Sequence, residues 1–236
     1  MKKILTLSLL LIFSINSFSQ SKEDCLSNLS IFAEYAKVKN YDAAYEPWLE
    51  VKSQCPKLNI AIYVYGERLL KSFIKKSEGN KRDEYQEDLL DLYDEWLKHF
   101  SKSKSGKNEM GKILAIKAQT MIDYKLADNE TIYDVYDMAF TNDPQSFKSP
   151  KGLYNYFKIY FGLYKENNSD VSLEKVFEKY EELTEKFEFE MEAYTSKLDL
   201  LLKKEENNDP ISARELRNKK VYEVNMVACD TYLNNL

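Results

Sequence analysis

Residues 39–56 read KNYDAAYEPWLEVKSQCP, and the spacing of the apolar residues in this stretch decides the fold class. Ala44, Trp48 and Val51 follow one another at steps of four and three, which places them on one face of an α-helix. Pro56 ends the stretch and cannot continue a helix, because it lacks a backbone donor and its ring clashes with the preceding turn. The stretch therefore predicts an amphipathic helix that stops just before Pro56.

The segment before this helix shows the same period. Its apolar face carries Leu26, Leu29, Ala33 and Ala36. The interruption at Val38–Asn40 is so short that the two helices must be antiparallel neighbours, an αα-hairpin whose turn is made by Asn40 and Tyr41. Pro47 lies inside the second helix, where it is expected to produce a kink.

Two of the three cysteines flank this hairpin symmetrically. Cys25 and Cys55 each lie fifteen residues from Asn40, so antiparallel helices place them side by side at the open end. We predict a Cys25–Cys55 disulfide; two free thiols are the alternative. Cys229 remains, and we interpret it as a buried thiol beside Val224 and Val227, or else as a thiol that forms an intermolecular disulfide.

The rest of the chain is also predicted to be helical. The whole sequence contains only 6 Gly and 5 Pro, which is too few for many hairpins and short strands. The further helices are expected at about 58–77, 81–100, 107–126, 129–141, 150–166, 171–190, 191–206 and 210–234. Asn129 is the expected cap of one helix, and Pro210 is expected at the start of the last. The break near residue 190 is open, since 171–206 could form one long bent helix.

One spacing recurs along the chain, and a second matches a known repeat pattern. The steps of four and eight residues that separate Ala44, Trp48 and Pro56 are repeated by Ile132, Tyr136 and Pro144, with Ala139 between the last two. A second set, Ile62, Tyr65, Gly66 and Leu69, fits the pattern W-x2-L-G-x2-Y. Small residues let two helices approach closely, and large aromatic residues fill the gap to the next pair.

These residues resemble the tetratricopeptide pattern. The best match is the unit with Tyr35, Tyr41, Ala44, Trp48 and Pro56. The opening from Cys25 to Pro56 is similar, more narrowly, to exported tetratricopeptide proteins of the Bacteroidota cell envelope. The resemblance implies an all-α protein, a right-handed α-solenoid of about 8–10 antiparallel helices. It implies a repeat domain over residues 20–206, followed by a capping helix over 207–236.

The N-terminus has the features of a secretory signal. Lys2 and Lys3 precede an apolar run from Ile4 to Ile15, and the small residues Ser17 and Ser19 follow. We predict that residues 1–19 are removed on export; a retained anchor is the alternative. Loss of the two lysines takes the formal net charge from −5 to −7, which argues against nucleic-acid binding. The mature protein is expected to be soluble, without a transmembrane helix, and periplasmic or extracellular.

The sequence offers little catalytic chemistry. His99 is the only histidine, too few for most zinc sites, and we interpret it as a residue at a helix C-terminus that interacts with the helix dipole. The carboxylates of 178–192 are interpreted as a solvated helix face. Phosphate-binding, serine-hydrolase and HExxH motifs do not occur. The sequence thus favours a non-catalytic protein without cofactor or metal.

The leading hypothesis is therefore a scaffold or adaptor that binds protein partners in the cell envelope. Its groove is expected on the first helix of successive hairpins, with Tyr63, Glu67, Lys71, Lys117, Met121 and Tyr124 as contacts. Joint exposure of Tyr63 and Tyr124 would make this groove plausible, and their burial would remove it. One alternative is a small-ligand-binding or hydrolytic helical protein with a carboxylate–tyrosine pocket. Another is a structural subunit with an exposed apolar patch near Val221, Val224 and Tyr232.

Overall fold

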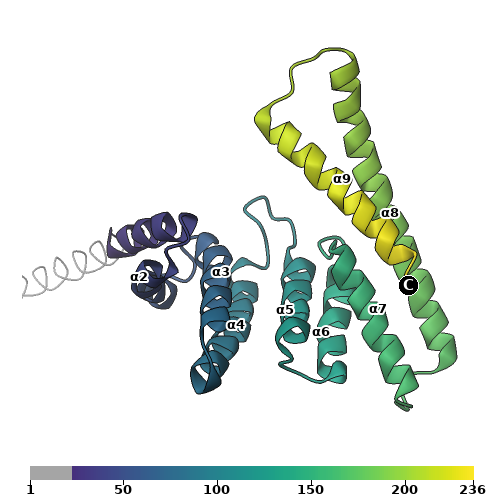
Figure 1. Cartoon of the computed structure of the whole chain (residues 1–236), viewed down its shortest axis with the longest axis horizontal. Coiled ribbons are helices and arrows are strands. Elements are labelled where there is room, and N and C mark those ends of the chain that lie inside the picture. The colour runs from purple at the N-terminus through teal and green to yellow at the C-terminus, as the bar shows by residue number, and fades with distance from the viewer. Residues whose placement is uncertain (1–22) are drawn as a thin grey trace, which may run out of the picture. The chain divides into compact units, whose positions relative to one another are not determined.

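The computed structural model describes residues 23–236, which fold into helices joined by turns and loops, without a strand in that part of the chain (Figure 1). The predicted signal segment, residues 1–19, lies outside the described residues. No helix in the described part is long and apolar enough to cross a membrane. The chain divides into two compact units, one ending at Ser103 and one beginning at Lys104. The boundary lies in the polar segment 101–106, and the all-α class is confirmed.

The first unit contains four helices in its described part. They are the first helix (23–37), α2 (Tyr41–Gln54), α3 (Ala61–Lys76) and α4 (Gly79–Phe100). Consecutive members of α2, α3 and α4 pack against one another. Two boundaries differ from the predicted ones, since α3 begins three residues later than expected and α4 two residues earlier.

The turn of the first hairpin closes through backbone hydrogen bonds. Lys39 adopts a left-handed conformation with φ of 61°, and the N–H of Asn40 donates to the carbonyl of Tyr35 at 2.9 Å. This is the Schellman arrangement, which satisfies carbonyls at a helix C-terminus. The Asn40 side chain then accepts from the N–H of Ala43 at 3.4 Å and caps α2. The predicted turn at Asn40 is confirmed, with Lys39 providing the reversal.

Trp48 lies at the centre of the first unit. Its indole is buried, and Nε1 donates a hydrogen bond of 2.9 Å to the carbonyl of Ile62. Gly66 lies directly beneath the indole, because a Cβ there would stand 2.6 Å from Nε1. α2 continues through Pro47, whose missing N–H leaves the carbonyl of Ala43 without its usual helical donor. Tryptophan and glycine thus form one close contact between α2 and α3.

The predicted disulfide is confirmed. Cys25, in the first helix, is bonded to Cys55, the C-cap residue that follows α2, and their Cα atoms are 6.2 Å apart. The bond closes the open end of the hairpin opposite the turn at Lys39.

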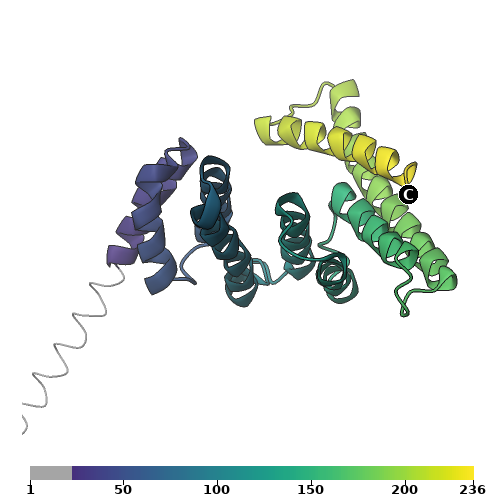
Figure 2. The same ribbon diagram turned by 60° about the horizontal axis from the view of Figure 1, so that its bottom comes forward.

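The second unit contains five helices (Figure 2). They are α5 (Met110–Tyr124), α6 (Asn129–Asn142), α7 (Pro150–Lys165), α8 (Leu173–Glu206) and α9 (Ala213–Leu233). Each packs against the next, and α9 returns along α8 until its end reaches α7. There the rings of Tyr154 and Tyr232 lie 5.2 Å apart. The cap of α6 is Asp128, so the expectation that Asn129 caps this helix is wrong.

The predicted break near residue 190 is wrong, and the alternative of one long helix is correct. α8 runs for 34 residues, a segment that contains neither glycine nor proline. Glu190, at its centre, is 1 % exposed and accepts hydrogen bonds from Lys186 and Lys148 at 2.6 and 3.1 Å. The last helix begins after Pro210, at Ala213, because Ser212 and Glu215 form a reciprocal capping box.

The repeat seen in the sequence corresponds to a repeat in the structure. α2 and α6 both have 14 residues, both begin after a side-chain N-cap, and both are followed within two residues by proline. Their buried positions correspond as well. These are Ala44, Trp48 and Val51 in α2, and Ile132, Tyr136 and Ala139 in α6. The following helices, α3 and α7, both have 16 residues.

Candidate partner-binding groove

The second unit has an open groove between α5 and α7, which we call the α5–α7 groove. Its volume is about 420 Å³, and residues from α5, the start of α6 and α7 line it. The apolar part is formed by Met121, Ile122, Ile132 and Ile159, and the polar part by Lys125, Asn129, Asn155 and Lys158. Ala127 and Gly162 complete the lining. An apolar floor with a few polar groups is typical of ligand and partner sites.

The turn between α5 and α6 positions one side of the groove. Lys125 is left-handed, with φ of 58°, and the N–H of Leu126 donates to the carbonyl of Met121 at 2.9 Å. Asp128 then caps α6 by accepting from the N–H of Thr131 at 2.8 Å, a bond that lowers the pKa of Asp128. The turn thus uses the same Schellman arrangement as the first hairpin. It holds the Lys125 backbone at the rim of the groove.

One face of α7 forms the other side of the α5–α7 groove. Asn155, Lys158, Ile159 and Gly162 recur at steps of three, one and three, so they share a face. The opposite face carries the buried residues Leu153, Tyr156, Phe157, Tyr160 and Leu163. Asn155 is fixed by a hydrogen bond of 2.8 Å from Nδ2 to the side-chain oxygen of Gln119 on α5. α7 therefore buries one face and leaves a mixed polar and apolar face towards the groove.

The charges of the groove are separated. Lys125 and Lys158 are both exposed, and neither forms an ion pair with any residue of the described chain. A second hollow of about 490 Å³ adjoins the first, shares Ala127 and Asn129 with it, and carries the acidic groups. These are Asp128, Glu130 and Glu166. The groove thus has two unpaired positive charges over its apolar floor and an acidic end next to it.

The structure places only one of the six predicted contacts in this groove. Met121 lines it, although its side chain is mostly buried. Lys117 and Tyr124, on the same helix, are half-buried and stand outside its lining. Tyr63, Glu67 and Lys71 lie on α3 in the first unit, so they cannot be joined to the α5 residues in one described site.

The prediction for Tyr63 is wrong. Its ring is fully buried, packs against Trp96 at 6.1 Å between ring centres, and its hydroxyl donates to the carbonyl of Pro56 at 3.1 Å. Burial also raises the pKa of Tyr63. Glu67 is occupied as well, accepting from Lys71 at 2.7 Å and from the Tyr93 hydroxyl at 3.0 Å. These residues belong to the core and its border.

Several groove residues were missed by the sequence reasoning. Lys125, Asn129, Asn155 and Lys158 were not among the predicted contacts. The spacing of 155, 158, 159 and 162 was a usable signal, because it marks the face of α7 opposite its aromatic stripe. The contribution of Lys125 depends on the conformation of the turn, which no periodic pattern indicates.

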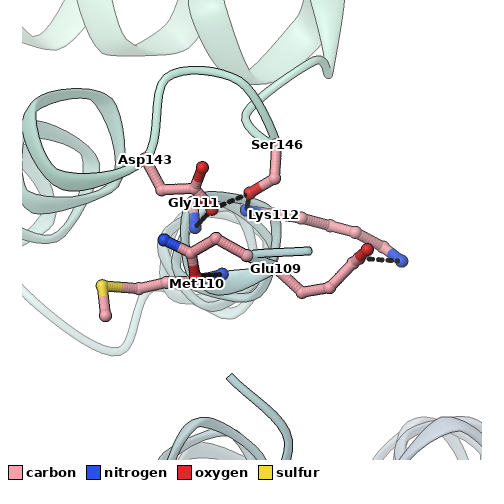
Figure 3. A network of polar contacts seen from close by, with 7 residues as sticks. Glu109, Met110, Gly111, Lys112, Asp143 and Ser146 are labelled. Carbon is pink, nitrogen blue, oxygen red and sulfur yellow. Dashed lines mark hydrogen bonds and ion pairs between the residues drawn. The ribbon is translucent and has the colours of Figure 1, made fainter. Parts of the chain in front are cut away.

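A buried polar network at the start of α5 is structural (Figure 3). Asp143 accepts from the N–H of Gly111 at 3.0 Å, and Ser146 accepts from the N–H of Lys112 at 2.9 Å. The Ser146 hydroxyl in turn donates to Asp143. The first amides of a helix have no partner within that helix, and here residues from beyond α6 provide the acceptors. The network therefore caps α5 from another segment.

A second polar cluster is the closest match to a carboxylate–tyrosine site. Asp137 accepts from the hydroxyls of Tyr133 and Tyr156, and Lys179 donates to Tyr156 at 3.0 Å. Burial, followed by the bond to Asp137, raises the pKa of Tyr156, so the phenol stays protonated. A protonated phenol is not a general base at neutral pH. The cluster joins α6, α7 and α8 through mutually satisfied polar groups.

Cys229 is buried, and His99 is half-buried. Cys229 is fully buried on α9, and burial raises its pKa to about 11. Val224 and Val227 are 60 % and 68 % exposed, so the expectation that they pack beside Cys229 is wrong. His99 lies in the last turn of α4, as predicted, but burial lowers its pKa and Nδ1 has no hydrogen-bond partner among the described residues. A neutral imidazole gains little from the helix dipole.

Within residues 23–236 no group of three or more histidine, cysteine or acidic side chains could hold a metal ion. Comparisons with protein-family models, with curated proteins and with solved structures found no match to this chain.

Proposed function

We propose that this protein is an exported, non-catalytic scaffold or adaptor that binds a protein partner in the cell envelope through the α5–α7 groove. The observation that carries the proposal is the combination of an open apolar floor with two unpaired lysines, Lys125 and Lys158. Ile122 and Ile159 are the partly exposed apolar residues of this floor, and uncompensated charge beside them is typical of a surface that meets a partner of opposite charge.

The repeated hairpins support a tetratricopeptide-like architecture. α2 and α6 share length, capping and buried positions, and each is followed by a 16-residue helix, α3 or α7. A right-handed solenoid built from such pairs would present the first helix of each pair along one surface. The α5–α7 groove lies between two such helices, so it agrees with the predicted type of surface.

The disulfide supports export. Cys25 and Cys55 are joined, and disulfides persist in oxidising compartments such as the periplasm and the cell exterior. With the signal-like residues 1–19, this favours a periplasmic or extracellular location. Fractionation of cells that express the full chain, followed by N-terminal sequencing, tests this part; a chain retained in the cytoplasm would contradict it.

A photo-cross-linking experiment tests the groove. A photoreactive amino acid at Ile159 or Asn129 is expected to form an adduct with a partner in the envelope, whereas one at the exposed Asp134 is not. The double variant K125E/K158E is expected to lose the adduct. The matched control K102E/K104E, two exposed lysines outside the groove, is expected to keep it. Adducts that survive K125E/K158E, or unmodified monomer at both groove positions, would overturn the proposal.

A structural subunit that binds through α9 is a second candidate. Val221 and Val224 are 53 % and 60 % exposed and Val227 extends the patch, whereas Tyr232 is half-buried and packs against Tyr154. A photoreactive residue at Val224 distinguishes the two functions: adducts from Val224 but not from Ile159 would favour the structural subunit.

A further inference from the structure

Gly162 is the one glycine of the chain that the fold does not explain. Gly79 and Gly106 have positive φ, and a Cβ at Gly66, Gly111 or Gly152 would come within 3 Å of a neighbouring atom. A Cβ at Gly162 would meet nothing within 4 Å. Its φ is not positive either, since it lies within α7. Neither backbone conformation nor internal packing requires glycine there.

Glycine at position 162 lowers the stability of α7. It lies three residues before the end of α7, and its carbonyl accepts from the N–H of Glu166 at 3.0 Å. In a helix, glycine is less stable than alanine, because the unfolded chain has more freedom to lose and no side chain packs. Because glycine at position 162 costs stability and no neighbouring atom requires it, we expect it to be needed for contact with another molecule.

The place of Gly162 suggests that requirement. It lines the α5–α7 groove beside Ile159, on the face of α7 that also carries Lys158. Glycine has no side chain to cover the helix backbone. Another chain can therefore approach the helix more closely at a glycine than at a position that holds any other residue.

We propose that Gly162 is the contact at which an acidic amphipathic helix of a partner protein packs directly against the backbone of α7. This inference rests on the proposed function, because it names the kind of partner that the α5–α7 groove binds. Apolar residues of the partner helix cover Ile122 and Ile159, and its carboxylates lie opposite Lys125 and Lys158. A small residue of the partner faces Gly162.

The chemistry of the groove favours a helix over an extended segment. The groove is lined by helices, whose internal backbone amides and carbonyls are already paired within α5 and α7. It therefore offers no sheet edge to which a strand could add. A partner segment that buries its backbone there must satisfy its own peptide groups, which a helix does. Helix-in-groove recognition also gives side chains the spacing needed to reach the floor and both lysines.

The unpaired charges favour an acidic partner. Lys125 and Lys158 have no ion-pair partner among the described residues, whereas the acidic hollow lies beyond Ala127 and Asn129. A basic segment over the floor would meet two like charges, and such pairing is unfavourable across an interface.

A ligand-free experiment tests the premise. Gly162→Ala is expected to raise the Tm by about 1–5 °C, because alanine is the better helix former and its Cβ enters open space. Gly66→Ala is the matched control, also inside a helix, and is expected to lower the Tm because its Cβ meets Trp48 at 2.6 Å. A lower Tm for Gly162→Ala would show that the fold needs this glycine and would overturn the inference.

A binding experiment tests the partner class. A displayed library of randomised helical peptides is selected on the full chain, and the affinities of the selected peptides are then measured by fluorescence anisotropy. Selected peptides are expected to be acidic and amphipathic, with a small residue on the apolar face. Their affinity is expected to fall about tenfold or more for Gly162→Leu, because the added side chain fills the close contact. Circular dichroism checks that Gly162→Leu remains folded.

The outcomes separate the two proposals. If the peptides bind K125E/K158E more weakly than the wild type but bind Gly162→Leu as tightly as the wild type, the role of Gly162 is overturned and the groove remains the binding site. Peptides that are basic, or that lack a small residue, would overturn the proposed partner chemistry. Peptides insensitive to both changes, or a selection that yields no binder, would overturn the groove itself and with it the inference drawn from Gly162.

Discussion

Asp143 accepts a hydrogen bond of 3.0 Å from the backbone N–H of Gly111. In the hairpin of the second unit, Gly111 takes the position that Cys25 has in the first unit, and Asp143 takes the position of Cys55. Cys25 and Gly111 each precede the left-handed residue of their turn by fourteen residues, and Cys55 and Asp143 each follow an N-cap residue by fifteen. The open end of each hairpin is thus closed between equivalent positions, covalently in one unit and by a hydrogen bond in the other.

The Asp143 link explains why glycine occupies position 111. A Cβ at Gly111 would stand 2.1 Å from the carbonyl oxygen of Asp143, so the start of α5 can approach the end of α6 only without a side chain. In the first unit the equivalent positions hold two cysteines, and a disulfide keeps the two backbones farther apart than the close approach at Gly111. The Cα atoms of Cys25 and Cys55 are 6.2 Å apart.

Removal of the Asp143 carboxylate is expected to destabilise the second unit. Asp143→Ala leaves the N–H of Gly111 without its acceptor and also removes the partner of Ser146, at a cost of about 1–3 kcal/mol. Urea unfolding measures the loss, and hydrogen exchange is expected to accelerate at the amides of Gly111 and Lys112. Asp134→Ala, at an exposed site of α6, is the control and should change little. Equal effects of the two substitutions would contradict the capping role.

Reduction of the disulfide is expected to destabilise the first unit. The cysteines are separated by 30 residues, and release of a loop of that length costs about 3–4 kcal/mol in the chain-entropy description. The C25S/C55S variant and the wild type in reductant should unfold at the same, lower urea concentration. Cys229→Ser in oxidising buffer is the control for general thiol effects. Non-reduced peptide mapping that joins Cys25 to Cys229 would contradict the pairing.

Loss of Glu190 is expected to be among the most damaging single changes in α8. Its carboxylate is 1 % exposed and accepts from Lys186 and Lys148, and Lys186 is itself buried. Glu190→Ala leaves the Lys186 ammonium without its partner, which costs about 3–5 kcal/mol. Glu188→Ala, exposed on the same helix, should have almost no effect. The double variant E190L/K186M should recover most of the stability; a double variant as unstable as E190A would show that packing rather than charge is responsible.

The thiol of Cys229 is expected to make stability depend on alkaline pH. Burial, with a further contribution from Glu190, raises its pKa from 9 to about 11, and Lys186 opposes the shift. Because the folded state holds the proton more tightly, this stabilisation is complete below pH 9 and is lost as pH rises towards 11. Urea unfolding at intervals between pH 8 and 11 measures the slope, and Cys229→Ser should have a smaller one. Equal slopes would contradict the prediction, as would rapid alkylation of native Cys229 at pH 8.

The positions of the helices were largely predictable, because apolar periodicity and turn residues act locally. Ala44, Trp48 and Val51 indicated the buried face of α2, and the equal distances of Cys25 and Cys55 from the turn indicated the disulfide. The errors lay where long-range contacts override local signals. Glu190 looked like part of a solvated acidic face, yet it is 1 % exposed and accepts from Lys148, which lies before α7, as well as from Lys186 on its own helix.

The sequence by itself determined the all-α class, the first hairpin and its disulfide, since each depends on residue spacing along one or two neighbouring helices. Only the tertiary structure decided which residues are accessible. Tyr63 lies on α3 as expected but faces the core, whereas Lys125, Lys158 and Gly162 share a groove because the α5–α6 turn and one face of α7 converge there. Accessibility is a property of what packs on each face, and periodicity along one helix does not contain that information.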